Sequence, residues 1–433
     1  MTTMIKEAAT VRIAAVRVTP ILIADPPLLN IQGVHQPYAS RTIVEVETNS
    51  GVVGLGETYG DTDFLTVAQA FAPELVGQPL YVNDLGARVR EQTEQVELAR
   101  VDTSVRAGGL RGTRTLNKIA CSVASAFEVA IYDAVGRETG LPVHALLGGR
   151  VRDQVEFSAY LFYRWAEHPD GNGLTDDWGA ALDPATVVTQ AQRMSETYGF
   201  DSFKLKGGVF APEEEVAAVQ ALADAFPGKP VRLDPNGAWS VPTSLRVAAE
   251  LEGIAEYLED PATGTKAMAE VAAGTSLPLA TNMCVTSFAE ISEAFASDAV
   301  QVVLSDHHYW GGLRATQELA AICRTYDVGL SMHSNTHVGI SLAAMSQVAS
   351  TIPTLRYACD THRPWQLEDV ITEPHAFVDG KLPVTDTPGL GVELDHDSLH
   401  RLHQRWIELP EFHDRDDQAA IRRVHPDWTE PRW

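Results

Sequence analysis

The chain has 433 residues, 45% of them apolar and 21% charged, a composition typical of a globular protein with a full hydrophobic core. Its 33 basic and 58 acidic residues give a net charge of −25, so the protein as a whole repels polyanions. We therefore expect neither a nucleic acid nor an anionic membrane surface as a partner.

The cysteines and the N-terminal residues favour a cytoplasmic protein. Cys121, Cys284, Cys323 and Cys359 lie far apart, so we expect buried free thiols rather than a disulfide framework or a thiolate zinc site. Residues 1–7 lack the apolar core of a signal peptide, and no stretch approaches the roughly 20 apolar residues that span a bilayer.

Residues 1–150 are expected to form an α+β domain. Apolar and polar residues alternate through residues 11–60, which predicts an antiparallel meander with a turn at Asn49-Ser50-Gly51. Helical patterning follows, clearest over residues 124–135, and it ends near Gly140.

Residues 151–385 alternate between strand-like and helix-like segments. Seven short apolar runs each end in polar residues, and an earlier run, Val155–Tyr163, brings the number of expected strands to eight. The polar run ends are spaced 28, 25, 23, 24, 27 and 29 residues apart, close to the about 30 residues of one βα unit of a barrel. They are Lys206, Asp234, Glu259, Asn282, Asp306, His333 and His362.

This spacing predicts eight parallel strands that close into a barrel and carry all these side chains on one rim. That rim is the C-terminal face, where barrel active sites are built. The alternative is a doubly wound open sheet, but the nearest glycine-rich motif, Gly54-Leu55-Gly56 with Gly60, has the wrong spacing for a dinucleotide site. Residues 386–433 look loop-like, and we expect them to pack back on the N-terminal domain.

Three successive strand ends, at Asp234, Glu259 and Asn282, offer only oxygen ligands. A hard divalent cation such as Mg²⁺ prefers oxygen ligands and leaves coordination positions for water or substrate. In the alternative interpretation these residues cap the following helices, and Asp234-Pro235-Asn236-Gly237 is a good turn sequence. Three consecutive strand ends favour the metal site.

Lys204 and Lys206 alternate with Leu205, so both lysines are expected to point into the barrel mouth. A second ammonium and a metal ion nearby would lower the pKa of Lys206 and let it act as a base. The alternative is a pair of structural ion pairs, which requires two acidic partners.

His333 follows one strand and Asp306 the strand before it. A carboxylate beside an imidazole fixes its tautomer and supports its protonated form, as in a base with its orienting group. Taken alone, His333 could be a structural histidine. His333 and His337 form an H-x-x-x-H without the Glu of a zinc motif, so zinc is not expected, and His307 and His308 have no assigned role.

A lysine on one side of a cation and a His–Asp pair on the other suit the removal of a proton next to a carboxylate. A positioned base contributes only roughly 10²–10⁴-fold to such a step. The rest has to come from stabilising the enediolate, which a bound cation can do. Enolase-superfamily sites combine a Lys or His base with Mg²⁺ in this way.

The chain resembles the enolase superfamily and, within it, the glucarate dehydratases, from about residue 10 to the C-terminus. Asp306 lies in an equivalent setting, and an Asn as third ligand beside a lysine pair is specific to this subgroup. The matching stretches are Phe203-Lys204-Leu205-Lys206-Gly207-Gly208, Arg232-Leu233-Asp234-Pro235-Asn236-Gly237-Ala238-Trp239, Ala280-Thr281-Asn282-Met283, Met332-His333-Ser334-Asn335 and Asp360-Thr361-His362.

The resemblance implies an α+β capping domain over a (β/α)₇β TIM-like barrel, Mg²⁺ as cofactor and an aldarate as substrate. It also implies the dehydration of D-glucarate to 5-keto-4-deoxy-D-glucarate. We further expect the protein to be a homo-oligomer. His333 with Asp306 would take the α-proton from glucarate, and Lys206 would take it from the epimer L-idarate.

The resemblance further implies a set of substrate contacts. Asn236, Ser334 and Asn335 would hold the distal hydroxyls and carboxylate. The other implied substrate-contacting residues are His35, Tyr160, Lys204, His362 and Arg415.

Two departures from the family pattern border the pocket. The stretch after Glu259-Asp260-Pro261 is short, so Glu259 is assigned to the metal with Asp260 as the alternative. A substrate-binding threonine in the capping domain corresponds equally well to Thr113 or Thr115. Galactarate or another aldarate therefore remains an alternative substrate, and an epimerase or racemase, or a barrel that binds sugar acids without catalysis, an alternative function.

Overall fold

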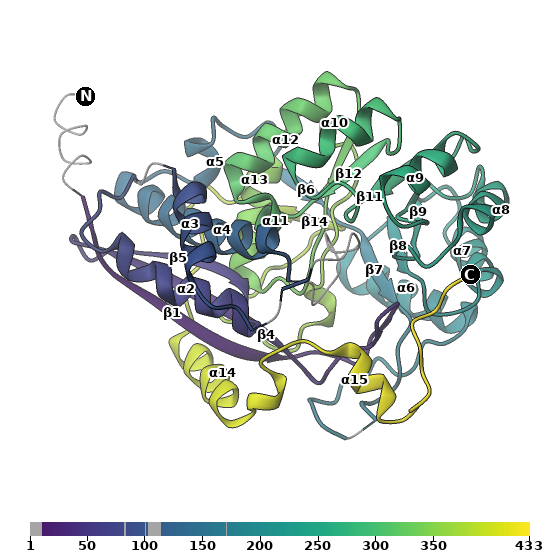
Figure 1. The fold of residues 1–433 in the computed structure, drawn as a ribbon, viewed down its shortest axis with the longest axis horizontal. Helices are drawn as coiled ribbons and strands as arrows, with labels where there is room; N and C mark the ends of the chain where they lie inside the picture. Colours follow the sequence, from purple (N-terminus) through teal and green to yellow (C-terminus); the bar gives the residue numbers. More distant parts are fainter. Residues whose placement is uncertain (1–10, 82–83, 100, 103–113, 170) are drawn as a thin grey trace.

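The computed structural model describes residues 11–81, 84–99, 101–102, 114–169 and 171–433. One body is built from the N-terminal part of the chain and a larger one from its middle, and the C-terminal segment runs along both (Figure 1). The fold is a (β/α)₇β TIM-like barrel with an α+β capping domain, which confirms the predicted fold class. The domain limits at residues 150 and 385 stay predictions.

The sheet of the capping domain consists of β1 (Ile13–Ala24), β4 (Tyr38–Thr48) and β5 (Val53–Tyr59), in the order β1-β4-β5. Both pairings are antiparallel, as the alternation of apolar and polar residues predicts. A short hairpin of β2 (Leu29–Asn30) and β3 (Gly33–Val34) interrupts the meander between β1 and β4. This hairpin reaches the mouth of the barrel, so it matters for the site below.

Four helices belong to the capping domain and its junction with the barrel. They are α2 (Thr62–Leu75), α3 (Leu85–Gln95), α4 (Leu116–Thr139) and α5 (Val143–Leu146). Helix α4 packs on β5. Thr115 caps it by accepting a hydrogen bond from the Lys118 N–H, and Gly140 ends it in the left-handed region at φ 70°.

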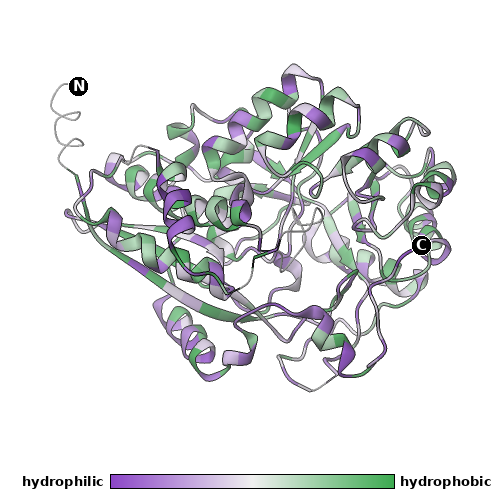
Figure 2. Ribbon diagram, viewed as in Figure 1, coloured by the Kyte–Doolittle hydropathy of each residue, from purple (hydrophilic) through white to green (hydrophobic). Residues whose placement is uncertain are grey.

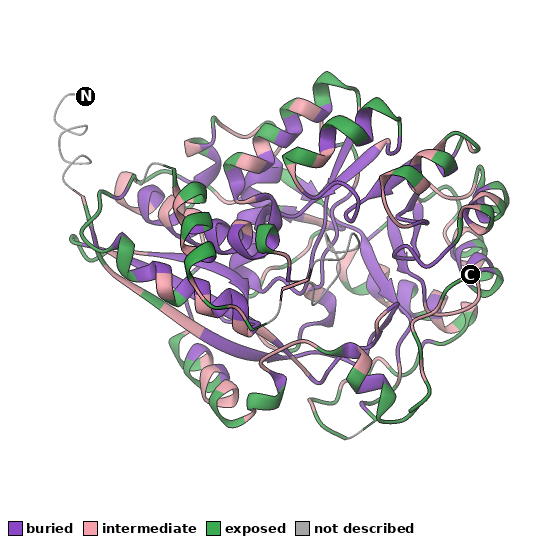
Figure 3. Cartoon of the chain, in the orientation of Figure 1, coloured by how far each residue is buried: buried purple, intermediate pink, exposed green. Residues whose placement is uncertain are grey.

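Helix α4 also corrects the expectation that no segment is long and apolar enough to span a bilayer. It passes that test by length and composition, but 83% of its most apolar window is buried inside the protein. Figure 3 shows α4 largely in the colour of buried residues, whereas outer helices such as α10 and α14 carry mostly exposed and intermediate residues. Its hydrophobicity is that of a core helix.

Seven parallel strands form the barrel sheet, and every residue in them is buried. Parallel strands covered by helices on one side and core on the other are largely apolar, as β12 (Val302–Ser305) illustrates in Figure 2, apart from charged residues such as Lys204, Lys206 and Asp234. The strands are β7 (Ala159–Phe162), β8 (Phe203–Lys206), β9 (Val231–Asp234), β10 (Tyr257–Glu259), β11 (Leu279–Thr281), β12 (Val302–Ser305) and β13 (Gly329–Met332).

Helices alternate with these strands and cover the outside of the barrel. They are α6 (Pro184–Tyr198), α7 (Pro212–Ala225), α8 (Val241–Leu251), α9 (Thr265–Ala272), α10 (Phe288–Ala296), the short α11 (His307–Trp310), α12 (Leu313–Thr325) and α13 (Gly339–Ser350).

The first and the last predicted strands differ from the expectation. Val155–Tyr163 is split into β6 (Gln154–Glu156), which pairs with β14 (Lys381–Pro383), and β7. The predicted strand at residues 357–362 is reduced to a bridge between Cys359 and Phe157. Asp360 N donates to Met332 O at 2.8 Å, and Ser158 N donates to Cys359 O at 2.8 Å, so this segment still closes the barrel between β13 and β7.

The prediction of a loop-like C-terminal segment is wrong in its local structure. Residues 386–433 contain α14 (His396–Glu408), a short 3-10 helix (Pro410–Phe412) and α15 (Asp417–Arg422). Another 3-10 helix (Arg363–Trp365) lies before this segment. Helix α14 lies along β1 of the capping domain (Figure 1). His403 Nδ1 donates to Pro20 O at 2.7 Å, and Arg405 donates to Leu22 O at 3.1 Å.

Candidate active site

The carboxyl ends of β8 to β13 bring the predicted polar residues to one end of the barrel. Parallel pairing sets Lys206 beside Asp234 and places Glu259 beside Ala280, two residues before Asn282. Carboxyl ends of parallel strands meet at the same rim, which is where barrel enzymes carry their active sites. All these side chains are buried.

The two lysines lie among the carboxylates of this rim. Lys206 Nζ is 2.6 Å from Asp234 Oδ2, and Lys204 Nζ is 2.6 Å from Glu259 Oε2 and 2.7 Å from Asp360 Oδ2. Lys204 thus has the two acidic partners that the structural interpretation required, and its contact with substrate stays a prediction.

The expected lowering of the Lys206 pKa depends on a bound metal ion and stays a prediction, whereas the protein's own groups shift this pKa upward. Burial and the nearby Lys204 ammonium both lower the pKa of Lys206, but the Asp234 carboxylate outweighs them and raises it above its usual range. At 2.6 Å this ion pair is stronger than the repulsion between the two ammonium groups. Lys206 is therefore protonated while Asp234 holds it.

The structure separates the roles of Glu259 and Asp260. Asp260 is occupied, because it accepts hydrogen bonds from Thr281 Oγ1 at 2.5 Å and from Asn282 N at 2.8 Å. Within the described part of the chain, Glu259 Oε1 is buried without a hydrogen-bond partner. A buried carboxylate oxygen of this kind fits a metal ligand, whereas Asp260 fixes the backbone that presents Asn282.

The structure of Asp234 is compatible with both interpretations that the sequence left open, a turn residue and a metal ligand. Its Oδ1 accepts from Asn236 N at 3.0 Å, which is the expected turn, while its Oδ2 faces Lys206. Asn236 adopts a positive φ of 53° in this turn. The turn carries Asn236 to the rim beside the acidic ligands.

His333 and Asp306 meet as expected. His333 Nδ1 lies 3.3 Å from Asp306 Oδ2, and both side chains are buried. Burial lowers the pKa of His333, and Asp306 opposes that shift. Burial raises the pKa of Asp306, but the surrounding imidazoles, led by His337 and His308, outweigh burial and keep it well below its usual range, so the carboxylate remains ionised.

A cavity with about 400 Å³ of empty space opens at this end of the barrel. Most of the predicted substrate and base residues line it: His35, Tyr160, Lys206, Asn236, His333, Ser334, Asn335 and His362. Asn30, Ile31, Gln32 and Phe162 also line it and were not predicted. Three of these four come from the β2–β3 hairpin, which is too short to give a periodic signal.

Arg415 and Thr115, two other residues considered as substrate contacts, are not among the residues that line this cavity. Arg415 forms buried ion pairs with Asp25 at 2.8 Å and with Asp417 at 2.8 Å, and it lines a neighbouring cavity that shares Asn335 with the first. Thr115 is the cap of α4, and Thr113 lies outside the described residues. Substrate contact by Arg415 or by either threonine stays a prediction.

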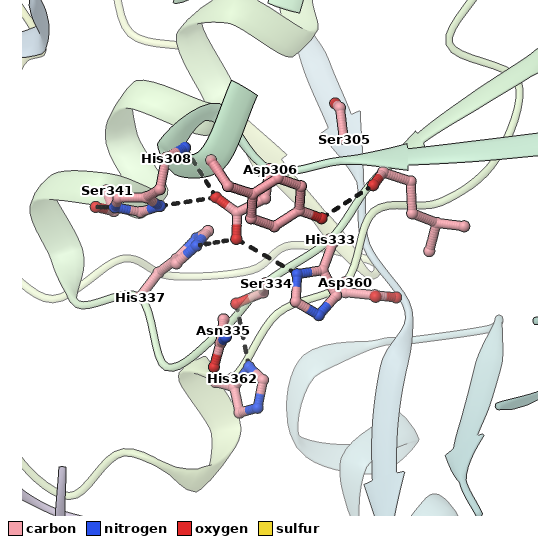
Figure 4. A network of polar contacts seen from close by, with 12 residues as sticks. Ser305, Asp306, His308, His333, Ser334, Asn335, His337, Ser341, Asp360 and His362 are labelled. Atoms are coloured by element: carbon pink, nitrogen blue, oxygen red, sulfur yellow. Dashed lines mark hydrogen bonds and ion pairs between the residues drawn. The ribbon is translucent and has the colours of Figure 1, made fainter. Parts of the chain in front are cut away.

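His307 and His308, to which the sequence assigned no role, do not lie in a loop. They are buried in α11, and with Asp306 they form a group whose ligand atoms lie within 4.8 Å of one another. Asp306 Oδ1 is already hydrogen bonded to His308 Nδ1 at 2.7 Å. We therefore interpret Asp306 and His308 as part of a hydrogen-bond network behind His333 (Figure 4).

Comparisons with known proteins agree with this geometry. A model described as mandelate racemase / muconate lactonizing enzyme, N-terminal domain, matches residues 9–148, and one described as enolase C-terminal domain-like matches residues 186–398. A probable glucarate dehydratase of Streptomyces coelicolor is 64% identical over 427 residues, which cover 97% of this chain and 99% of that protein.

Two solved structures are similar over almost their whole length. An enolase from Thermobispora bispora complexed with magnesium and formate is 49% identical, with a TM-score of 0.90 and coverage of 97% of this chain and 99% of that one. An enolase from Mycobacterium smegmatis complexed with tartrate is 52% identical, with a TM-score of 0.89 and coverage of 98% and 99%. The chain is thus a hydro-lyase from a family of Mg²⁺-dependent acid-sugar dehydratases and isomerases, and it belongs to the enolase superfamily.

Proposed function

We propose that this enzyme dehydrates an aldarate, D-glucarate first, and that it also accepts the epimer L-idarate. The observation that carries the proposal is that two bases of different chemistry, Lys206 and His333, line one cavity beside the oxygen-bearing residues of β9 to β11. The similarity to a probable glucarate dehydratase supports the choice of substrate.

Asp234, Glu259 and Asn282 would hold Mg²⁺. The fit rests on their all-oxygen donor set and on Glu259 Oε1, which is buried without a hydrogen-bond partner among the described residues. When bound, the cation supplies positive charge that stabilises the enediolate of the substrate carboxylate. Asp234 would share its charge with the cation, which weakens its hold on Lys206.

His333 would remove the α-proton of glucarate at Nε2, because Nδ1 faces Asp306. Ionised Asp306 stabilises the imidazolium that forms. Lys206, on β8, would remove the proton of the epimer whose C–H bond points the opposite way. One base for each face accounts for a lysine and a histidine in the same cavity.

The elimination of water uses one proton, which His333 removes from the α-carbon and returns to the leaving hydroxyl. The C–H electron pair becomes the new C=C bond as the β-hydroxyl leaves, and the proton held on the imidazolium of His333 can pass to that hydroxyl to form water. The resulting enol tautomerises to the keto product, which for glucarate is 5-keto-4-deoxy-D-glucarate.

The remaining polar residues of the cavity would orient the substrate. Asn236, Ser334 and Asn335 would hold the distal hydroxyls and carboxylate, and His362 is hydrogen bonded to Ser334 at 3.1 Å. His35 and Tyr160 would complete this set from the hairpin side and from β7, with Lys204 and Arg415 adding positive charge behind them.

Product analysis with a panel of aldarates tests the proposal. We expect a keto-deoxy acid from glucarate and idarate, and exchange of the substrate α-proton with solvent deuterium. Lys206→Ala should abolish exchange from idarate, His333→Ala should abolish it from glucarate, and the double variant should abolish both. Exchange by the double variant would refute the base assignment.

The same panel separates the alternatives. Dehydration of galactarate alone would identify another aldarate as substrate, and interconversion of epimers without a keto product would identify an epimerase. Binding without exchange or product would identify a barrel that lacks catalysis.

A further inference from the structure

A hydrogen-bond network lies behind His333, and Figure 4 shows its barrel part. It reaches the capping domain through the contact between His308 and Arg41. Asp306 Oδ2 lies 3.3 Å from both His333 Nδ1 and His337 Nε2, whereas Oδ1 accepts from His308 Nδ1 at 2.7 Å and from His308 N at 3.0 Å. His308 thus holds the oxygen of Asp306 that does not face His333. It is fully buried.

The two ends of the His308 ring define its tautomer. Nε2 faces the Arg41 guanidinium at 3.3 Å and Ser341 Oγ at 3.0 Å. A guanidinium can only donate, so Nε2 accepts and the proton is on Nδ1, where it is given to Asp306. The groups that face this ring are Asp306, His307, His337, Tyr59, Arg41 and Ser341.

Arg41 comes from β4 of the capping domain and is itself fixed. Its Nε donates to Glu57 Oε1 on β5 at 2.8 Å, and its guanidinium lies 5.0 Å from the centre of the Tyr59 ring. Glu57 also accepts from Val338 N at 3.0 Å and from Ser341 N at 2.8 Å, at the start of barrel helix α13. The network therefore runs from anionic Glu57 through cationic Arg41 and neutral His308 to anionic Asp306, which faces His333.

We propose that His308 is a positioning residue for the His333 base, held in place by the Arg41–Glu57 pair of the capping domain. His308 fixes the rotation of the Asp306 carboxylate so that its other oxygen meets Nδ1 of His333. The base is then correctly oriented only when the capping domain is docked on the barrel. This inference rests on the proposed function for its activity readout.

His308→Leu removes the hydrogen bond to Asp306 and is the first test. We expect kcat for the His333-dependent epimer to fall about 10- to 100-fold, part of the roughly 10²–10⁴-fold that a positioned base contributes, with little change in KM. The Lys206-dependent epimer should keep its rate, which controls for folding. His308→Asn places an amide near the Nδ1 position and should restore much of the lost rate.

The Arg41–Glu57 pair is tested with a double variant, because removing only one of the two charges would leave the other buried and unpaired. Arg41→Met combined with Glu57→Gln removes both charges, and we expect a smaller loss, about 3- to 10-fold, again confined to the His333-dependent epimer. Arg17→Met removes a capping-domain arginine whose ion pairs with Glu45 and Glu47 lie outside the network, and serves as control. Equal losses for both epimers, or no loss in either variant, would overturn the proposal.

A second readout does not depend on substrate. Nitrogen-15 spectra of histidine-labelled protein should show His308 with a protonated Nδ1 and an unprotonated Nε2, assigned by loss of the signals in His308→Asn. A proton on Nε2 would refute the network even if no aldarate were turned over. Absence of turnover in the wild type would instead refute the proposed function.

Discussion

Glu259 and Asp260 are neighbours in the chain with different surroundings, although both are buried carboxylates. Burial raises the pKa of Asp260 to about 7, while Thr281 and Asn282 donate to its two oxygens. Burial and the Asp234 charge also raise the pKa of Glu259 well above its usual range, and its Oε1 points at no hydrogen-bond donor among the described residues. A cation would give the buried Oε1 of Glu259 a partner, whereas both oxygens of Asp260 already accept hydrogen bonds.

Two amide substitutions should distinguish the ligand from its support. Glu259→Gln should weaken Mg²⁺ binding by about 100-fold, because a ligand charge is lost, whereas Asp260→Asn should weaken it by about 10-fold or less, since it acts through Asn282. Calorimetric titration with Mg²⁺ would measure both. A larger loss in Asp260→Asn would reverse the assignment.

Asn282 should tune the charge of the site. As a neutral third ligand it leaves the metal site one charge less negative than a third carboxylate, which favours a dianionic substrate. Asn282→Asp should therefore bind a diacid such as tartrate about 10-fold more weakly or worse while it binds Mg²⁺ at least as tightly. Unchanged affinity for the diacid, measured at saturating Mg²⁺, would contradict this electrostatic argument.

At the scale of elements, the loops after β8 and β9 are in close contact with each other. Gly208 follows the Lys206 strand end with φ 74°, and a Cβ there would collide with the Pro235 carbonyl and press on Ile31 of the hairpin. Glu215 of α7 fixes the same loop by accepting from the N–H groups of residues 208–210. The loop thus touches both the metal-ligand turn and the cavity wall.

Gly208→Ala should cost at least about 3 kcal/mol and also lower activity, because strain at positive φ adds to a backbone collision. Gly228→Ala is the matched control, with φ 73° and no atom of the described residues within 4 Å of the new Cβ, so only about 1 kcal/mol is expected. Denaturant unfolding and turnover would measure both. Similar losses in the two variants would show that the close approach is unimportant.

At the scale of the whole molecule, a half-buried glutamate joins the capping domain to the barrel. Glu128 of α4 accepts a hydrogen bond from Leu313 N at 2.5 Å, at the first turn of α12. Burial raises the pKa of Glu128 from 4.5 to about 7. An acid with a raised folded-state pKa is destabilising when ionised, so stability is lost as the pH rises from 4.5 through 7.

Glu128→Gln should remove this pH dependence. Between pH 5 and pH 8 the wild type should lose about 2.5 kcal/mol of unfolding free energy relative to the variant, because the pKa of Glu128 rises from 4.5 to about 7 on folding and each tenfold change in proton affinity is worth about 1.36 kcal/mol. Glu91→Gln, on the exposed face of α3, should follow the wild-type curve. Parallel pH curves for wild type and Glu128→Gln would show that the carboxylate is not held protonated at the junction.

The sequence by itself determined the barrel and the identity of its rim residues. Strand ends at intervals of 23 to 29 residues are typical of parallel βα units, and the carboxyl ends of such strands lie on one rim of a barrel. The sequence therefore assigned one group of residues to that rim: Lys204, Lys206, Asp234, Glu259, Asn282, Asp306 and His333. Hydrophobic periodicity also revealed the antiparallel sheet. These are local signals that one chain carries in its spacing.

Only the tertiary structure decided how those residues interact. The ion pair that raises the pKa of Lys206, the occupied oxygens of Asp260 and the pairing of Arg415 with Asp25 depend on distances between different segments of the chain. The same holds for His308, which has no sequence signal of its own. Ion pairs and hydrogen bonds act over a few ångströms. The spacing of residues along the chain predicts which residues lie on the rim of the barrel, but it does not predict which side chains face each other across the cavity.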